Sequence, residues 1–86
     1  MPSIEYTAHA LARMTERGVT RAQVEAVLTT AWRTRTAAQG RVEVQGLIER
    51  SDRPMLLRVI VERYAVVSVV VTVIATSKIS KYGADP

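Results

Sequence analysis

The chain has 86 residues, of which 48% are hydrophobic and 23% are charged, and its net charge is +4. This length leaves room for one domain, 1–86, and the ordinary globular composition excludes a disordered tail or a fibre. The absence of cysteine excludes disulfides and thiolate chemistry, and the longest apolar run is too short to cross a bilayer. We expect a cytoplasmic protein with no membrane partner, because the N-terminal segment does not look like a secretion signal.

Two short helices are predicted first. Thr7 is a typical helix N-cap and Gly18 a typical C-terminal residue, so the spacing between them predicts a helix over Ala8–Arg17. Thr20 and Gln23 have the spacing of a capping box, which begins a second helix of about eleven residues. On the first helix one side is apolar and should face the core, and the other is polar: Ala8, Ala10, Leu11 and Met14 against His9, Arg13, Glu16 and Arg17.

The rest of the chain is rich in β-branched residues. Its alternation and turn residues predict four strands, over 32–36, 41–50, 55–63 and 66–74, with turns at 38–40 and 51–54. Gly46 marks a possible bulge, and Thr76 is expected to cap a short C-terminal helix that runs through Tyr82. The fold class is therefore α+β, with two helices, four strands and a last short helix.

The strand at 66–74 is apolar on both of its alternating faces, with valines on each. A strand with one face in water would alternate more cleanly, so we expect this one to be covered on both sides. The helical hairpin can cover one side. The C-terminal segment, a second copy of the chain or a partner protein could cover the other.

Arginine dominates the cations, with ten arginines and two lysines against eight acidic residues. Guanidinium groups grip phosphate, which favours a nucleic-acid ligand, although general codon bias toward arginine, alanine and valine explains the count equally well. No phosphate-binding glycine loop is present, and one histidine with scattered acids does not make a zinc site, so no metal or cofactor is expected.

Three groups of side chains remain as candidates for chemistry. His9 and Arg13 are four residues apart on one helix face, which Arg17 extends, although a plain solvated face is the simpler interpretation. Arg58 lies within an apolar strand, where it either serves a cleft or pairs with Glu43, Glu49 or Glu62. The third group is the C-terminal set of Lys78, Lys81 and Tyr82, whose simpler role is solubility.

Segments at both ends of the chain resemble a known family. The opening YTAHALARMTERGVT and the ending VVTVIATSKISKYG resemble the start and end of a small prokaryotic family of uncharacterised domains, and MLLRVIVE resembles its third strand. That family is similar in layout to RelE-, ParE- and BrnT-like toxins, in which N-terminal helices pack on a four-stranded antiparallel sheet. Ile74 stands where the family usually has an aromatic residue, which argues against stacking there.

The resemblance implies a toxin-like endoribonuclease that cleaves RNA by attack of the 2′-hydroxyl without a metal. His9, Arg58 and Tyr82 are then expected to be catalytic, and four cations are expected to bind RNA: Arg13, Arg17, Lys78 and Lys81. Its partners would be RNA and an antitoxin-like protein, or a second copy through the sheet. The alternative is a non-catalytic interaction module, such as a ParE-like inhibitor or a partner-binding subunit. DNA binding by the helical hairpin ranks lower, because the second helix offers only Arg21 and Gln23 near its start.

Overall fold

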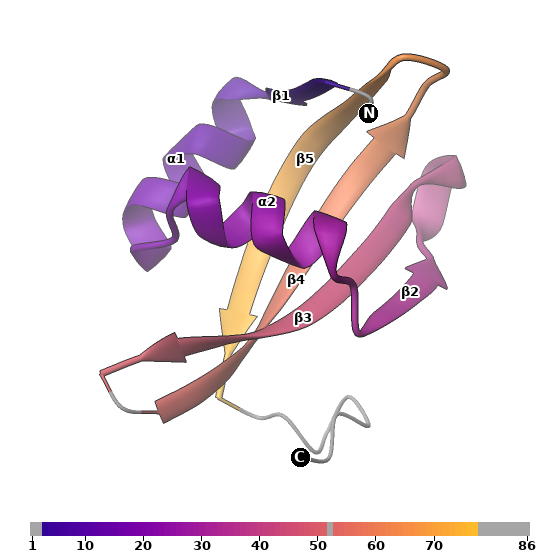
Figure 1. The fold of residues 1–86 in the computed structure, drawn as a ribbon. Helices are drawn as coiled ribbons and strands as arrows, with labels where there is room; N and C mark the ends of the chain where they lie inside the picture. The colour runs from indigo at the N-terminus through magenta and orange to yellow at the C-terminus, as the bar shows by residue number, and fades with distance from the viewer. Residues whose placement is uncertain (1–2, 52, 78–86) are drawn as a thin grey trace.

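A computed structural model describes residues 3–51 and 53–77 as a five-stranded mixed sheet with two helices (Figure 1). In sheet order the strands run β1-β5-β4-β3-β2, with β1 parallel to β5 and the other neighbours antiparallel. The elements in chain order are β1 (Ser3–Tyr6), α1 (Ala8–Arg17), α2 (Arg21–Thr29), β2 (Arg33–Thr36), a 3₁₀ turn η1 (Ala38–Gly40), β3 (Val42–Arg50), β4 (Arg53–Arg63) and β5 (Val67–Thr76). The predicted α+β class is confirmed.

The helix boundaries follow from local capping, as predicted. Thr7 accepts a hydrogen bond from the Ala10 amide at 3.0 Å, and Gly18 ends α1 in the left-handed region with φ 66°. The capping box of α2 has both of its hydrogen bonds, between Thr20 and Gln23. This helix has nine residues, fewer than the eleven expected. Leu11 was also misplaced, because it is 37% exposed and leaves the buried side of α1 to Ala10 and Met14.

The prediction of a four-stranded antiparallel sheet was wrong, because it missed β1. This strand has only four residues, and it pairs in parallel with residues of β5 more than sixty positions away. Only two residues of this strand, Ile4 and Tyr6, turn toward the core. Two apolar positions are too few to show the alternation of apolar and polar residues by which a strand is recognised in a sequence. The sheet is therefore mixed.

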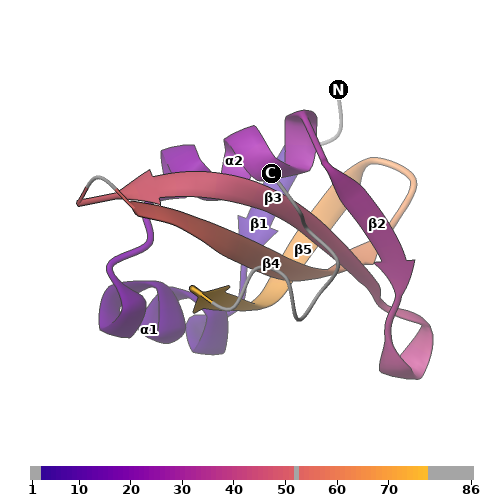
Figure 2. The ribbon, with the colours of Figure 1, turned by 90° about the horizontal axis from the view of Figure 1, so that it is seen from below.

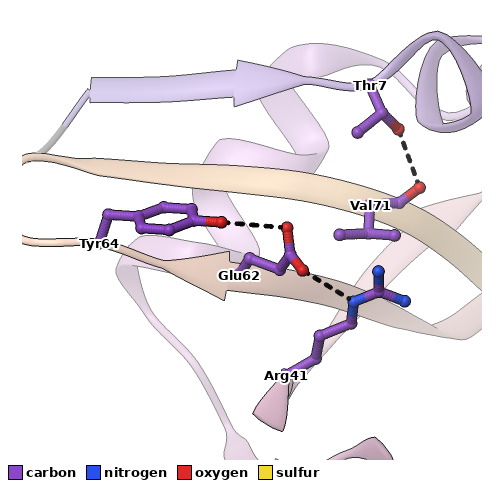
Figure 3. Close-up of polar contacts among 5 residues, drawn as sticks. All are labelled: Thr7, Arg41, Glu62, Tyr64 and Val71. Carbon is purple, nitrogen blue, oxygen red and sulfur yellow. Dashed lines mark hydrogen bonds and ion pairs between the residues drawn. The ribbon is translucent and has the colours of Figure 1, made fainter. Parts of the chain in front are cut away.

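Thr7 is the residue at which β1 becomes α1. Its backbone amide donates to the Val70 carbonyl, and its hydroxyl donates to the Val71 carbonyl at 3.0 Å while accepting from Ala10 (Figure 3). Val71 is the extra residue of a bulge, because β4 pairs Ile60 with Thr72 and Val61 with Val70. The first helix therefore lies beside β5 from the point where β1 stops.

Other strand details differ from the sequence prediction. Residues 53 and 54, expected in a turn, begin β4, where Pro54 pairs with Glu49 beyond the end of the β5 ladder, so its missing N–H breaks no bond to β5. Gly46 is not a bulge, since it pairs regularly with Leu57. Thr76, which was expected to cap a helix, is the last residue of β5. The rest of the expected C-terminal helix, residues 78–82, lies outside the described residues.

Both helices pack on one face of the sheet, α1 beside β5 and α2 over β3 and β4. The sheet between them is strongly twisted (Figure 2). The core lies between them and consists of Ala10, Met14, Val19, Val24, Val27, Val44, Ile48, Leu57, Val59, Val61, Val70 and Val73. The alternate residues of the strands point to the second face, where Leu56 is also fully buried. No helix in the described part of the chain is long and apolar enough to cross a membrane.

The contact of α2 with β3 depends on the lack of a side chain at Gly46. A β-carbon added there would lie 3.0 Å from Val27 Cγ2, closer than ordinary van der Waals contact. We therefore expect Gly46→Ala to lower the free energy of unfolding by about 1 kcal/mol through overpacking. In a Val27→Ala background the same change should be neutral or stabilising, because space is free and strand glycine is entropically costly. Urea unfolding of all four proteins measures the coupling, and additive effects would contradict this close contact.

Candidate functional site

Polar side chains of three adjacent strands meet on the second face of the sheet. The register places Arg33 opposite Gln45, Arg35 opposite Glu43, and Gln45 opposite Arg58. Their neighbours along β3 and β4, such as Val44 and Val59, belong to the core on the other face. We call these five residues the second-face cluster: Arg33, Arg35, Glu43, Gln45 and Arg58.

Glu43 and Arg58 form a two-pronged ion pair at the centre of this cluster. Arg58 Nε donates to Glu43 Oε2 at 2.8 Å, and Arg58 Nη2 donates to Oε1 at 2.9 Å. The side chains are 10% and 20% exposed, respectively, so little water screens the pair. The hydrogen bonds from Arg58 lower the pKa of Glu43 below its usual 4.5, burial opposes them, and Gln45 and Arg35 add to the lowering. Glu43 is therefore an anion at neutral pH.

Gln45 is fully buried beside this ion pair. Its Nε2 donates to Glu43 Oε2, while its Oε1 is buried and has no hydrogen-bond partner. A buried carbonyl oxygen without a partner carries a desolvation cost, so the cluster is not fully satisfied within itself. Arg33 and Arg35 lie on the exposed strand β2. The charge of Arg35 acts on Glu43, whereas the Arg33 guanidinium lies over the Trp32 ring, 4.9 Å from its centre. The arrangement can bind an anion by charge and by paired N–H donors.

A second ion pair lies further along the same face (Figure 3). Arg41 Nε donates to Glu62 Oε2 at 3.2 Å, and the Tyr64 hydroxyl donates to Glu62 Oε1 at 3.4 Å. Arg41 and Glu62 are each about one-third exposed, at 32% and 36%. A pair this accessible to solvent is screened and contributes little stability.

The helix candidates lie on α1. His9 is exposed near its start, Arg13 Nη1 is 3.4 Å from Glu16 Oε1, and Arg17 is exposed in the last turn. No hydrogen bond or ion pair connects His9 to Arg13, Arg17 or Arg58 within residues 3–51 and 53–77. The structure thus places His9 and Arg58 on separate elements without contact. Their catalytic roles stay predictions.

The remaining candidates are C-terminal. Lys78, Lys81 and Tyr82 lie outside the described residues, so their expected roles in charge stabilisation and proton donation also stay predictions. The described residues contain no group of three histidine or carboxylate side chains that could hold a metal ion.

Tyr6 is a half-buried phenol that the sequence analysis did not single out. Its hydroxyl donates to Glu25 Oε2 at 3.1 Å, and the Arg21 guanidinium lies 4.8 Å from its ring centre. Burial raises the pKa of Tyr6 to about 12, with a further contribution from the hydrogen bond to Glu25. Tyr6 therefore stays protonated at neutral pH, and its hydrogen bond to Glu25 connects β1 to α2.

Sequence reasoning anticipated one part of the second-face cluster and missed the rest. An ion pair of Arg58 with Glu43, Glu49 or Glu62 was one of two open alternatives, and the structure selects Glu43. Gln45 and the arginines of β2 were missed, because their position beside Glu43 depends on strand register. The alternation of the predicted strand over 32–36 was the available signal, since it puts Arg33 and Arg35 on one face.

The lowered pKa of Glu43 predicts a pH dependence of stability. Protonating Glu43 costs free energy in the folded state, so this contribution is present above its usual pKa of 4.5 and is lost as pH falls through the folded value. We expect Glu43→Gln to be less stable than wild type at neutral pH, because Arg58 loses its carboxylate partner. This difference should stay constant from about pH 7 down to about pH 5, and shrink as the pH falls below the usual pKa of 4.5.

Urea unfolding at each pH measures this difference. Glu49→Gln is the matched control, since Glu49 is exposed on the same strand and makes no ion pair in the described part of the chain. A stability difference between wild type and Glu43→Gln that does not change with pH would show that the pKa of Glu43 is not lowered by folding.

Comparison with known proteins gives one clear result. No curated protein and no solved structure matches the chain. A family model, described as a domain of unknown function (DUF4258), matches residues 6–79, which include both helices and all strands from β2 to β5. The chain therefore belongs to the DUF4258 family of domains.

Proposed function

We propose that this domain is a toxin-like endoribonuclease that cleaves RNA by attack of the 2′-hydroxyl, without a metal. The second-face cluster is the observation that carries the proposal. Two guanidinium groups from different strands act on one ionised carboxylate, with Arg35 exposed and Arg58 paired to Glu43, and the exposed Arg33 lies on the same face against Trp32. Such a group can hold a phosphodiester and offset the charge that develops on the phosphorane.

Cleavage requires three functions around the phosphate. A base takes the proton of the 2′-hydroxyl, cations stabilise the phosphorane, and an acid protonates the leaving 5′-oxygen as the P–O5′ bond breaks. Arg35 and Arg58 supply the cations in this proposal. Glu43 becomes a better base when the phosphate competes for Arg58, because the hydrogen bonds from Arg58 hold its pKa down. In this proposal Glu43 is the base, and Tyr82 keeps the role that the resemblance implies. The expected acid–base role of His9 stays a prediction, because His9 lies on α1 and has no hydrogen bond or ion pair to this cluster in the described residues.

The proposal is tested with purified protein and a labelled single-stranded RNA in EDTA. We expect fragments that end in a 2′,3′-cyclic phosphate, because the 2′-oxygen is the nucleophile. Arg35→Ala should slow cleavage by about tenfold to a hundredfold through loss of a charged hydrogen bond. His9→Ala separately tests the predicted role of His9 in proton transfer, for which we expect a loss of about a hundredfold or more. Both side chains are exposed, so folding should not change.

Arg63→Ala is the matched control for Arg35→Ala. Arg63 is exposed at the end of β4, and its loss changes the net charge equally. Activity that depends on a divalent metal, or that survives Arg35→Ala, would contradict the proposal. A flat activity profile between about pH 5 and 8 would remove His9 alone from the mechanism.

An interaction module is the second candidate, and a specific observation favours it. Arg58 already donates twice to Glu43, which reduces its capacity to hold a phosphate. Large apolar side chains are also exposed at the β4–β5 turn, with Tyr64 at 58% and Val66 at 75%. Growth arrest on expression with intact cellular RNA would favour this function, whereas arrest with new RNA fragments favours the nuclease.

A further inference from the structure

A second cationic site lies at the opposite side of the sheet from the second-face cluster. A hollow of about 400 Å³ opens between the end of α1 and the β3–β4 hairpin. It is lined by Glu16, Arg17, Arg50, Ser51, Arg53, Met55 and Ala75. Arg50 and Arg53 are opposite each other in the hairpin, in alternation with Ile48 and Met55, so they belong to the helix side. We call this the hairpin hollow.

The charge in the hairpin hollow is unbalanced. Its lining includes three arginines, and none of them makes an ion pair with an acid in residues 3–51 and 53–77. Glu16 is the one acid among the lining residues, and it is shared with Arg13 at 3.4 Å. Asp52 follows Ser51 in the sequence, and the three arginines still outnumber the acids when Asp52 is counted with Glu16. Guanidinium groups that line one hollow without acid partners repel one another, and an anion relieves that repulsion.

One of the arginines is positioned by the backbone. A β-carbon at Gly18 would lie 2.8 Å from Arg50 Nη2, so the guanidinium occupies the space that a side chain would fill. The end of α1 carries partial negative charge, which attracts Arg50 to this position. Its other N–H groups, together with those of Arg17 and Arg53, are left to face the hollow. The site thus has one arginine placed against the end of α1, and two more on α1 and β4.

The remaining wall is apolar. Met55 and Ala75, both half-buried, lie on neighbouring strands at the edge of the core. The volume falls within the range of about 300–1,000 Å³ that is typical of small-molecule sites. A bare phosphate would use the arginines and leave this wall empty, whereas a nucleotide can place its base against the thioether and methyl groups.

We propose that the hairpin hollow binds the phosphomonoester of a nucleotide, with the phosphate held by Arg17, Arg50 and Arg53 and the base against Met55. The ligand is either a free nucleoside monophosphate or the 5′-phosphate end of an RNA, which share this chemistry. The assignment is independent of the nuclease proposal, because it uses no residue of the second-face cluster. Arg35→Ala should leave this binding unchanged.

Calorimetric titration of the full chain with adenosine 5′-monophosphate tests the site. We expect saturable binding that is at least about tenfold tighter than that of adenosine or of inorganic phosphate, since each lacks half of the contacts. Arg53→Ala should weaken it by about tenfold or more, and Arg17→Ala should do the same from another element. Arg63→Ala, at the far end of the same strand as Arg53, should have no effect.

Three results would overturn the proposal. They are no saturable binding of the monophosphate, equal weakening by Arg63→Ala, and phosphate alone binding as tightly as the nucleotide. Met55→Ala provides a second check, because it should lower nucleotide affinity toward that of phosphate while phosphate binding is retained. A 5′-phosphorylated trinucleotide compared with its 5′-hydroxyl form then separates the two sources. If the 5′-phosphorylated trinucleotide binds more tightly than adenosine 5′-monophosphate, the ligand is an RNA end. If the trinucleotide binds more weakly than the monophosphate, the ligand is the free nucleotide.

Discussion

The hydrogen bonds of Thr7 determine how the two layers of this domain fit together. One residue ends β1 through its amide, begins α1 through its hydroxyl, and satisfies the carbonyl of the bulged Val71. Because β1 stops there, α1 can lie beside the second half of β5 and bring Ala10 and Met14 to the core. The helical hairpin then places α2 over β3, where Gly46 allows a close approach of Val27. All apolar packing of the helices is thereby gathered on one face of the sheet.

This one-sided packing leaves polar chemistry to the second face and to the ends of the sheet. The second-face cluster is held by strand register, since Arg35, Glu43 and Arg58 come from three adjacent strands. The hairpin hollow is held differently, by the approach of the last turn of α1 to the β3–β4 hairpin. Two groups of arginines with different surroundings therefore share one small domain. In the second-face cluster Glu43 neutralises part of the positive charge. In the hairpin hollow the arginines have no ion pair with an acid among the described residues.

Features that depend on neighbouring residues were predicted from the sequence, and features that depend on contacts between distant segments were missed. The bounds of α1 were predicted correctly, because Thr7 and Gly18 act within one helical turn. The long strands were found from their β-branched residues, with ends shifted by a few positions. The strand at Ser3–Tyr6 was missed, because its pairing with β5 joins opposite ends of the chain. The position of Arg50 against Gly18 was missed for the same reason, since nothing in the local sequence joins residues of a helix end and a hairpin.

The edge strand β2 has a consequence for how the domain meets other copies of itself. All four of its residues, Arg-Thr-Arg-Thr, are exposed, and the outer hydrogen-bonding groups of this strand have no neighbouring strand in the described sheet. A second sheet that docked there in antiparallel register would bring two pairs of guanidinium groups into contact. Arg33 and Arg35 therefore disfavour edge-to-edge association between copies of the domain, and the same charges that could bind an anion would keep this short strand from extending a shared sheet.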